Sequence, residues 1–309
     1  MSQLSQNIVK NLKILQEYEI ISKQPFKAKA YNKVIDQIEL YGENISCLGD
    51  LDSIKGIGEG IHKKIAQLIN NGKIDAVEIV LKDKNYILAK NILNVYGIGP
   101  AKLSELLPLI SKFEDLYLEN IYKLLNEKQK IGLQYYNDLL VRIPYAEAKD
   151  HHKVISSKID STITFEMVGS YRRKNKDMGD IDILIKNKDG FKLTSIITKL
   201  KTSGYIVETL ASGKNKFMGI CKLPNLPTRR IDILVAEPSY YYFALLYFTG
   251  SYNFNIYMRR IALKKDLSLS EYGFKNNKTK EFVKIENICS EEDIFKYLEI
   301  PYVLPENRI

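Results

Sequence analysis

The sequence predicts an α+β protein in which helical domains precede a domain with a mixed β-sheet and a small C-terminal α+β domain. Up to about residue 144, apolar residues recur at intervals of three and four, as in Ile8, Leu12 and Leu15, which is typical of amphipathic helices. The pattern then changes, and TFEMVGS, DIDILIK and RRIDILV have the character of short strands. Two Gly-Ile-Gly turns interrupt the helical half. We therefore expect a helical half followed by an α+β half.

The composition is that of a basic globular protein with two to four compact domains. The 309 residues carry a formal net charge of +9, which favours a polyanionic partner such as nucleic acid. The cysteines Cys47, Cys221 and Cys289 are scattered, which argues against disulfides or a zinc site and predicts a reducing, intracellular compartment, nuclear or cytoplasmic. The longest apolar run, YYYFALLYFTG, is too short to span a membrane, and the charged N-terminal stretch is unlike a signal peptide. No membrane partner is expected.

Each Gly-Ile-Gly turn lies between two predicted helices, as in a helix-hairpin-helix motif. Gly56 and Gly58 form the first turn, and Gly97 and Gly99 form the second. Glycine permits positive φ and has no side chain, so backbone N–H groups at the next helix's start can meet a phosphate. Cations near the turns are supplied by Lys63, Lys64 and Lys102. One such turn alone could be a simple connection, but two copies in a basic chain predict DNA binding that is independent of sequence.

Asp180 and Asp182 stand two residues apart at the start of the apolar strand DIDILIK. Side chains at i and i+2 of a strand share one face, so the two carboxylates lie side by side and repel each other. A divalent cation between them removes this cost, and hard oxygen ligands favour Mg²⁺. Asp232 opens a second strand in the same Ile-Asp-Ile setting. If the strands are neighbours, three carboxylates converge, which is enough for a two-metal phosphoryl transfer site.

A Gly-Ser turn at Gly169-Ser170 precedes these carboxylates by about ten residues. Its backbone and hydroxyl donors, together with the guanidinium groups of Arg172 and Arg173, are suited to a triphosphate. The alternative for the aspartate pair alone is a solvated strand edge. The neighbouring turn and arginines favour a metal and triphosphate site instead.

The combined motifs resemble those of the family X DNA polymerases, of the polymerase beta type. The likeness rests on GSYRR-x5-GDID, RRID and LYFTGSYNFNIYMR, and it extends through IGLQYYNDLLVRIP and DIFKYLEIPYVLPENR essentially from end to end. A Gly-Ser turn with Asp-x-Asp alone would indicate only the wider nucleotidyltransferase superfamily. The resemblance implies four domains: a helical lyase-like domain (1–79), a duplex-DNA-binding helical domain (80–144), a nucleotidyltransferase palm (145–238) and a nucleotide-selecting domain (239–309).

The resemblance also implies roles for individual residues. Asp180, Asp182 and Asp232 would bind two Mg²⁺ ions, for which Mn²⁺ can substitute, and Asp232 would accept the proton of the primer 3′-hydroxyl. The residues implied in triphosphate binding are Ser170, Arg173, Gly179 and Arg142. Those implied at the sugar and the nascent base pair are Tyr247, Phe248, Gly250, Asn255 and Arg259, and Arg230 would contact the primer phosphate.

In the first domain, Lys64 matches the family's Schiff-base lysine, which excises a 5′-deoxyribose phosphate, and Lys27 and Tyr31 match its 5′-phosphate pocket. A lysine nucleophile must be neutral, and Lys63 and Lys27 are the neighbouring cations that favour this. The alternative for Lys64 is a plain phosphate contact. Lysines of the family's pocket are replaced here by Asp52, Gly60 and Ala76, so lyase activity slower than that of a full pocket is expected.

The implied function is a DNA-directed DNA polymerase that fills short gaps in base-excision repair, with 5′-deoxyribose phosphate lyase activity. The expected partners are gapped or nicked DNA with a 5′-phosphate, deoxynucleoside triphosphates and a DNA ligase. A monovalent cation is expected at each helix-hairpin-helix. The protein is expected to be a monomer. One alternative is a template-independent terminal transferase of the same family, although no insertion that would block template passage is apparent. The other is a catalytically silent scaffold that binds DNA ends, which the three aspartates disfavour.

Overall fold

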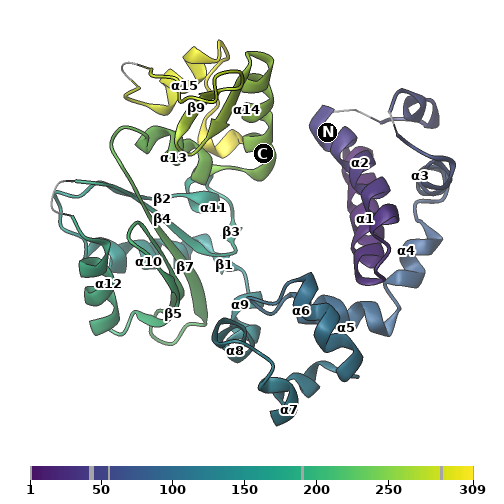
Figure 1. Ribbon diagram of the computed structural model, residues 1–309, viewed down its shortest axis with the longest axis horizontal. Helices are drawn as coiled ribbons and strands as arrows, with labels where there is room; N and C mark the ends of the chain where they lie inside the picture. Colours follow the sequence, from purple (N-terminus) through teal and green to yellow (C-terminus); the bar gives the residue numbers. More distant parts are fainter. Residues whose placement is uncertain (1, 42–44, 55, 189–190, 286–287, 309) are drawn as a thin grey trace. The chain divides into compact units, whose positions relative to one another are not determined.

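The computed structural model describes residues 2–41, 45–54, 56–188, 191–285 and 288–308. The chain divides into two compact units, Met1–Gln134 (unit 1) and Tyr135–Ile309 (unit 2), shown in Figure 1. The helical first half, the mixed sheet and the C-terminal α+β part all form as the sequence predicts. Within the described residues, no helix is long and apolar enough to cross a membrane.

Unit 1 is helical. Its α-helices are α1 (Gln3–Ile21), α2 (Pro25–Tyr41), α3 (Glu59–Asn71), α4 (Asp75–Val80), α5 (Lys84–Leu93), α6 (Pro100–Leu106), α7 (Glu119–Tyr122) and α8 (Glu127–Gln134). Short 3-10 helices are η1 (Leu48–Ser53), η2 (Leu107–Leu109) and η3 (Phe113–Tyr117). Ser2 is the N-cap of α1, and its side chain accepts a hydrogen bond from the backbone N–H of Ser5. Its apolar stripe, which includes Ile8, Leu12 and Leu15, is buried against α2, α3 and α4.

Unit 2 is built on a five-stranded sheet with the order β2-β4-β7-β6-β5. The strands are β2 (Phe165–Met167), β4 (Ile181–Lys186), β5 (Ile206–Ser212), β6 (Lys216–Lys222) and β7 (Thr228–Ala236). Only β4 and β7 run parallel among the paired strands described, and the other neighbours are antiparallel, so the sheet is mixed. Other elements of this part are α9 (Tyr136–Leu140), β1 (Ile143–Pro144), α10 (Tyr145–Ser156), α11 (Gly169–Arg172), β3 (Asp177–Met178) and α12 (Leu193–Thr202).

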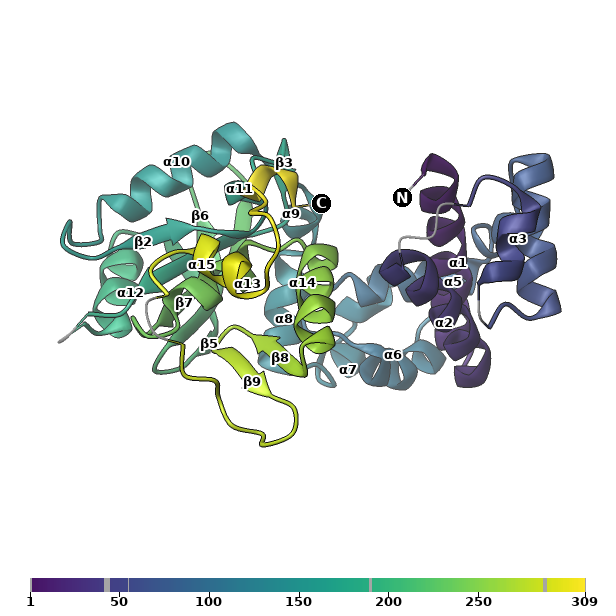
Figure 2. The ribbon, with the colours of Figure 1, turned by 90° about the horizontal axis from the view of Figure 1, so that it is seen from above.

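Alternation along the central strands gives the sheet two different faces. Ile181 and Ile183 of β4, with Ile231 and Ile233 of β7, pack beneath α10 and α12 in one core. Leu184 lies on the opposite face, against α13 (Tyr241–Thr249). Figure 2 shows α10 and α13 on opposite sides of β2. Even-numbered positions near the start of β4 and β7 therefore face the α13 side, and these include the predicted aspartates.

The C-terminal part of unit 2 packs around its own core. It comprises α13, α14 (Tyr252–Lys264), β8 (Leu267–Ser270), β9 (Gly273–Asn276), α15 (Glu291–Tyr297) and η4 (Pro305–Asn307). In Figure 2, α14 lies beside the β8–β9 hairpin, which it contacts. Arg308 is only 1% exposed and pairs with Glu291 at 2.7 Å, while Phe254 and Phe295 flank its guanidinium. This buried charge is thus both paired and stacked, which offsets its desolvation.

Candidate active site and nucleic-acid interface

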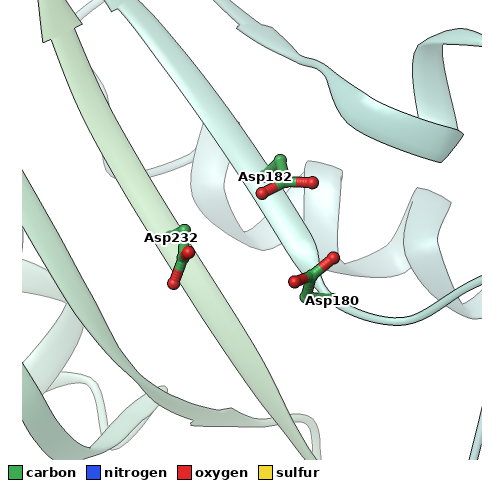
Figure 3. A group of neighbouring side chains, drawn as sticks. All are labelled: Asp180, Asp182 and Asp232. Atoms are coloured by element: carbon green, nitrogen blue, oxygen red, sulfur yellow. The ribbon is translucent and has the colours of Figure 1, made fainter. Parts of the chain in front are cut away.

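Three aspartates converge on the α13 face of the sheet (Figure 3). Asp182 and Asp232 are register partners on the parallel strands β4 and β7, and Asp180 directly precedes β4. One carboxylate oxygen of each residue lies within 4.8 Å of the others. The predicted convergence of the three carboxylates is therefore confirmed, and it is the alignment of β4 with β7 that produces it.

The electrostatics of this cluster favour a cation. Burial, reinforced by the negative charges of Asp180 and Asp232, raises the pKa of Asp182 to about 7. Burial also raises the pKa of Asp232, whose Oδ1 is buried and has no hydrogen-bond partner among the described residues. The guanidinium of Arg230 pairs with Asp180, and its positive charge offsets only part of the increase in the pKa of Asp182 and Asp232. The three aspartates therefore carry an excess of negative charge beside the neighbouring strands β4 and β7.

These residues fit a divalent metal site. The donors are carboxylate oxygens, which suit hard cations such as Mg²⁺. The unpartnered Oδ1 of Asp232 gives the site a ligand atom that the protein itself does not satisfy. The described residues thus include a group of three aspartates that could bind metal. The positive charge of Arg230 lies beside this group.

Gly169 brings the Gly-Ser turn into contact with the cluster. Its φ of +57° is in the left-handed region, and a Cβ at this position would collide with Oδ2 of Asp182. No other residue type combines this backbone conformation with so close an approach. The turn is recognisable in the sequence, but Gly169 is not among the predicted site residues, because its contact with Asp182 depends on strand β4.

Ser170 and Arg173 are joined at the same turn. Nη2 of Arg173 donates to Oγ of Ser170 at 3.0 Å, and Nη1 donates to the carbonyl oxygen of Thr249 at the end of α13. The same guanidinium lies against Gly250, where an added Cβ would be 3.2 Å from Nη1. Ser170, Arg173 and Gly250, all predicted site residues, are therefore brought together by the structure.

Arg142 and Gly179 also lie together. Nε of Arg142 donates to Oδ1 of Asp177 at 2.9 Å, and an added Cβ at Gly179 would be 3.1 Å from Nη1 of Arg142. Nη2 of Arg142 also donates to the carbonyl oxygen of Asp177 at 3.2 Å, and the side chain is 57% exposed. Because Gly179 directly precedes Asp180, this arginine lies at the edge of the carboxylate cluster.

Arg172 has a different role from the one expected. Its guanidinium donates to Glu166 at 3.1 Å, to Oγ1 of Thr249 at 2.8 Å and to Glu291 at 2.7 Å. All three nitrogens have partners, so the expectation that Arg172 offers its guanidinium to a triphosphate is not supported. It instead connects α11 to α13 and α15. Arg172 and Arg173 are adjacent, so the sequence alone could not show which of the two binds protein partners and which is left for a ligand.

The helices α13 and α14 position the predicted nucleotide-selecting residues. The rings of Tyr247 and Phe248 are 5.0 Å apart and nearly perpendicular. Nδ2 of Asn255 donates to the carbonyl oxygen of Tyr247 at 2.8 Å, and the Arg259 guanidinium lies 5.3 Å from the centre of the Tyr247 ring. Tyr247, Asn255 and Arg259 therefore form one connected group on α13 and α14.

Both helix-hairpin-helix turns are present in unit 1. Gly56 and Gly97 have φ values of +96° and +86°, and Gly58 and Gly99 are the N-cap residues of α3 and α6. A Cβ at Gly58 or Gly99 would have no atom within 4 Å. The start of each helix is thus open, as phosphate binding to backbone N–H groups requires.

The second hairpin depends on α8, which the sequence did not reveal. Gln129 donates from Nε2 to the carbonyl oxygen of Gly97 at 3.0 Å, and a Cβ at Gly132 would collide with the backbone of Tyr96. The only signal for this was the glycine in IGLQYY. Lys102 donates to the carbonyl oxygen of Leu124 and pairs with Glu105, so its amine is engaged within unit 1.

The predicted lyase residues lie on two helices. Lys27 and Tyr31 are on α2, where Tyr31 is buried, and Lys63 and Lys64 are on α3. The amine of Lys64 donates to the carbonyl oxygen of Gly60 at 3.3 Å. Lys63 pairs with Glu59 and Lys27 lies 3.9 Å from Glu19, so both expected cationic neighbours face carboxylates.

Three family models match separate parts of the chain. They are the helix-hairpin-helix domain at residues 5–74, the DNA polymerase beta palm at residues 142–238 and the DNA polymerase beta thumb at residues 244–309. Together with the three aspartates on neighbouring strands, they define a protein with a nucleotidyltransferase palm joined to helix-hairpin-helix modules.

Individual proteins give the same result. The chain is 29% identical to DNA polymerase lambda of Rattus norvegicus over 96% of its length and 27% identical to DNA polymerase lambda of Arabidopsis thaliana over 90%. It is 26% identical to DNA nucleotidylexotransferase of Xenopus laevis over 85% of its length. The chain spans 56% to 60% of the length of these relatives. It belongs to the family X DNA polymerases.

Proposed function

We propose that this chain is a DNA-directed DNA polymerase that fills short gaps during base-excision repair. The observation that carries the proposal is the register pairing of Asp182 with Asp232, beside Asp180 and the Gly169–Ser170 turn. Its similarity to proteins named DNA polymerase lambda supports DNA as template and deoxynucleoside triphosphates as substrates.

The residues of the site divide the work of nucleotidyl transfer. Asp180, Asp182 and Asp232 would hold two Mg²⁺ ions, which when bound neutralise the charge that develops during phosphoryl transfer. Asp232 accepts the proton of the primer 3′-hydroxyl, because a carboxylate can serve as a general base. Ser170 and Arg173 bind the triphosphate from one side and Arg142 from the other. Arg230 changes partner from Asp180 to the primer phosphate when DNA binds.

Primer extension tests this proposal. With Mg²⁺, the native protein should fill a one-nucleotide gap with the templated nucleotide, and Asp232→Asn should not. Untemplated addition to a blunt end at a comparable rate would instead support the terminal transferase, which the similarity to DNA nucleotidylexotransferase keeps as the second candidate. The short turn between β5 and β6, residues 213–215, favours templated synthesis because it leaves no insertion between these two strands. DNA binding without any extension would indicate a scaffold.

We also propose that unit 1 excises a 5′-deoxyribose phosphate through a Schiff base on Lys64. The support is the match of residues 5–74 to the helix-hairpin-helix domain and the position of Lys64 on α3. Borohydride should trap a covalent adduct with incised abasic DNA, and Lys64→Ala should remove most of it while gap filling continues. Lys73→Ala is a control on a lysine outside α3. Equal trapping without Lys64 would assign the chemistry to another lysine.

Gapped DNA with a 5′-phosphate is the proposed partner of unit 1. The open helix starts at Gly58 and Gly99 support phosphate contacts, and a monovalent cation at each hairpin would add to them. Affinity should be higher for gapped DNA with a 5′-phosphate than for intact duplex, measured by fluorescence anisotropy. We further propose that the protein acts as a monomer and passes its product to a DNA ligase.

A further inference from the structure

Two adjacent arginines on β7 point to opposite faces of the sheet. Arg230 is on the face of Asp232 and pairs with Asp180. Arg229 is on the other face, beneath α10, and is only 3% exposed. A buried guanidinium is costly unless every donor finds a partner, so its contacts report what it holds in place.

Arg229 holds two parts of unit 2 together. Nε and Nη2 donate to the carboxylate of Glu147 on α10 at 2.6 and 2.9 Å, which is a bidentate pair. Nη1 donates to the carbonyl oxygen of Val141 at 2.6 Å and lies 3.4 Å from that of Asp138. These carbonyls are at the end of α9, where a helix leaves backbone oxygens without internal partners. Arg229 therefore caps α9 and fixes it to α10.

The residue that follows this cap is Arg142. Its guanidinium reaches Asp177 and lies against Gly179, at the edge of the aspartate cluster. The strand β1 pairs with β3 just beyond it, with Pro144 opposite Asp177. The backbone of Arg142 thus lies between two fixed points, the Arg229 cap before it and the β1–β3 pair after it.

We propose that Arg229, through its pair with Glu147, is a positioning residue that sets Arg142 for the triphosphate of the incoming nucleotide. This inference rests on the proposed polymerase function. Arg229 does not touch substrate, since it is buried on the opposite face of the sheet. It acts by holding the carbonyl oxygen of Val141, so that the neighbouring Arg142 side chain starts from a fixed position. Thr228 supports the same segment, because its hydroxyl donates to the side-chain carboxylate of Asp138 at 2.8 Å.

The test is a double-mutant cycle with Arg142. Arg229→Lys keeps a charge beside Glu147 but lacks the planar fork that reaches Glu147 and Val141 together. In gap filling, Arg142→Ala should raise the KM for the nucleotide by about tenfold or more, as expected when a charge-assisted hydrogen bond is lost. Arg229→Lys should raise it by about threefold to tenfold, because that bond is weakened, with a smaller change in kcat. In the Arg142→Ala background, the same change should add less than about twofold.

Two further measurements separate positioning from loss of stability. Arg308→Lys is the matched control, a buried arginine paired with a glutamate in the C-terminal part, and its effect on KM should be the same with and without Arg142. Equilibrium binding of the nucleotide to the protein with dideoxy-terminated gapped DNA should give the same pattern without turnover. If Arg229→Lys folds poorly, Glu147→Gln replaces it in the cycle. This variant keeps an acceptor beside Arg229 and should also raise the KM for the nucleotide.

Equal effects of Arg229→Lys in both backgrounds would overturn the proposal, since a residue that only stabilises the palm is not coupled to Arg142. If the native protein neither extends primers nor binds nucleotide, the proposed polymerase function fails instead. Amide hydrogen exchange then still decides the role of Arg229. The amides of Val141 and Arg142 should exchange faster in Arg229→Lys than in Arg308→Lys, and equal exchange would contradict the cap.

Discussion

Asp182 and Asp232 are direct partners across the parallel strands β4 and β7, although 50 positions separate them in the sequence (232 minus 182). Between them the chain forms α12 and the antiparallel strands β5 and β6 before it returns beside β4. Parallel strands require such a crossover, and residues in register on them share a face. The pairing places two half-buried carboxylates side by side, and Asp180 adds a third.

Replacing one carboxylate should abolish activity while the fold becomes more stable without metal. Asp182→Asn should lower gap filling by several orders of magnitude, because the residue contributes to a site that acts as one unit. Since burial and neighbouring charges raise the pKa of Asp182 to about 7, removing its charge at pH 8 should raise the free energy of unfolding by on the order of 1–3 kcal/mol. Chemical denaturation with EDTA measures the stability change. Near-normal extension by this variant would exclude the proposed site.

Gly169→Ala should inactivate the protein by displacing a carboxylate. The new Cβ would collide with Oδ2 of Asp182, and the backbone at φ +57° is strained for alanine. We expect a loss of activity of at least about a hundredfold, as for other misplaced catalytic groups. Gly213→Ala is the control, because its Cβ would meet only an ordinary contact at 3.7 Å. Equal rates for the two variants would show that the turn is not part of the site.

Substitution of the two glycines of the second hairpin should affect different properties, stability at Gly97 and DNA binding at Gly99. Gly97→Ala introduces a Cβ at φ +86° and should lower the free energy of unfolding by on the order of 1–2 kcal/mol. Gly99→Ala has open space around its Cβ, so stability should change little, but the methyl group should hinder a phosphate and weaken DNA binding. Anisotropy titrations at several salt concentrations, with thermal unfolding, separate the two effects. Unchanged DNA affinity in Gly99→Ala would place the phosphate elsewhere.

Ribonucleotides should be excluded at Tyr247 and Phe248. The two perpendicular rings and the Asn255 bond to the Tyr247 carbonyl give the end of α13 a fixed shape against a 2′-hydroxyl. Tyr247→Ala or Phe248→Ala should raise the ratio of kcat/KM for a ribonucleotide to that for the matching deoxynucleotide. Tyr257→Ala, on an exposed tyrosine of α14, should leave the ratio unchanged. If the native protein already accepts both sugars equally, Tyr247 and Phe248 do not discriminate between them.

Stability should fall as the solution is made more acidic, in part through His151. Burial lowers the pKa of His151 to about 4, from its usual value of 6.5. The unfolded state therefore binds more protons than the folded state between these values, so stability present above pH 6.5 is lost as the pH falls toward 4. The loss should be on the order of 2–3 kcal/mol, at about 1.4 kcal/mol per pKa unit. The difference in unfolding free energy between the native protein and His151→Gln should shrink over this range, and a constant difference would contradict the assignment.

The sequence by itself determined features that depend on local rules. The strand period places Asp180 and Asp182 on one face, and the glycines of Gly-Ile-Gly mark both hairpins, because backbone conformation and side-chain direction follow from neighbouring residues. The family followed from the resemblance of GSYRR-x5-GDID, RRID and LYFTGSYNFNIYMR to known motifs, which are continuous stretches of sequence.

Only the tertiary structure decided the contacts between distant segments. It aligned Asp232 with Asp182, brought Gly169 against that carboxylate, and gave Arg172 three protein partners in place of a triphosphate. It also showed that Arg229 and Arg230, adjacent in the sequence, serve opposite faces of one sheet. Strand register and side-chain partners depend on which elements meet across the core, and that meeting is set by the burial of apolar faces over the whole unit rather than by any local pattern.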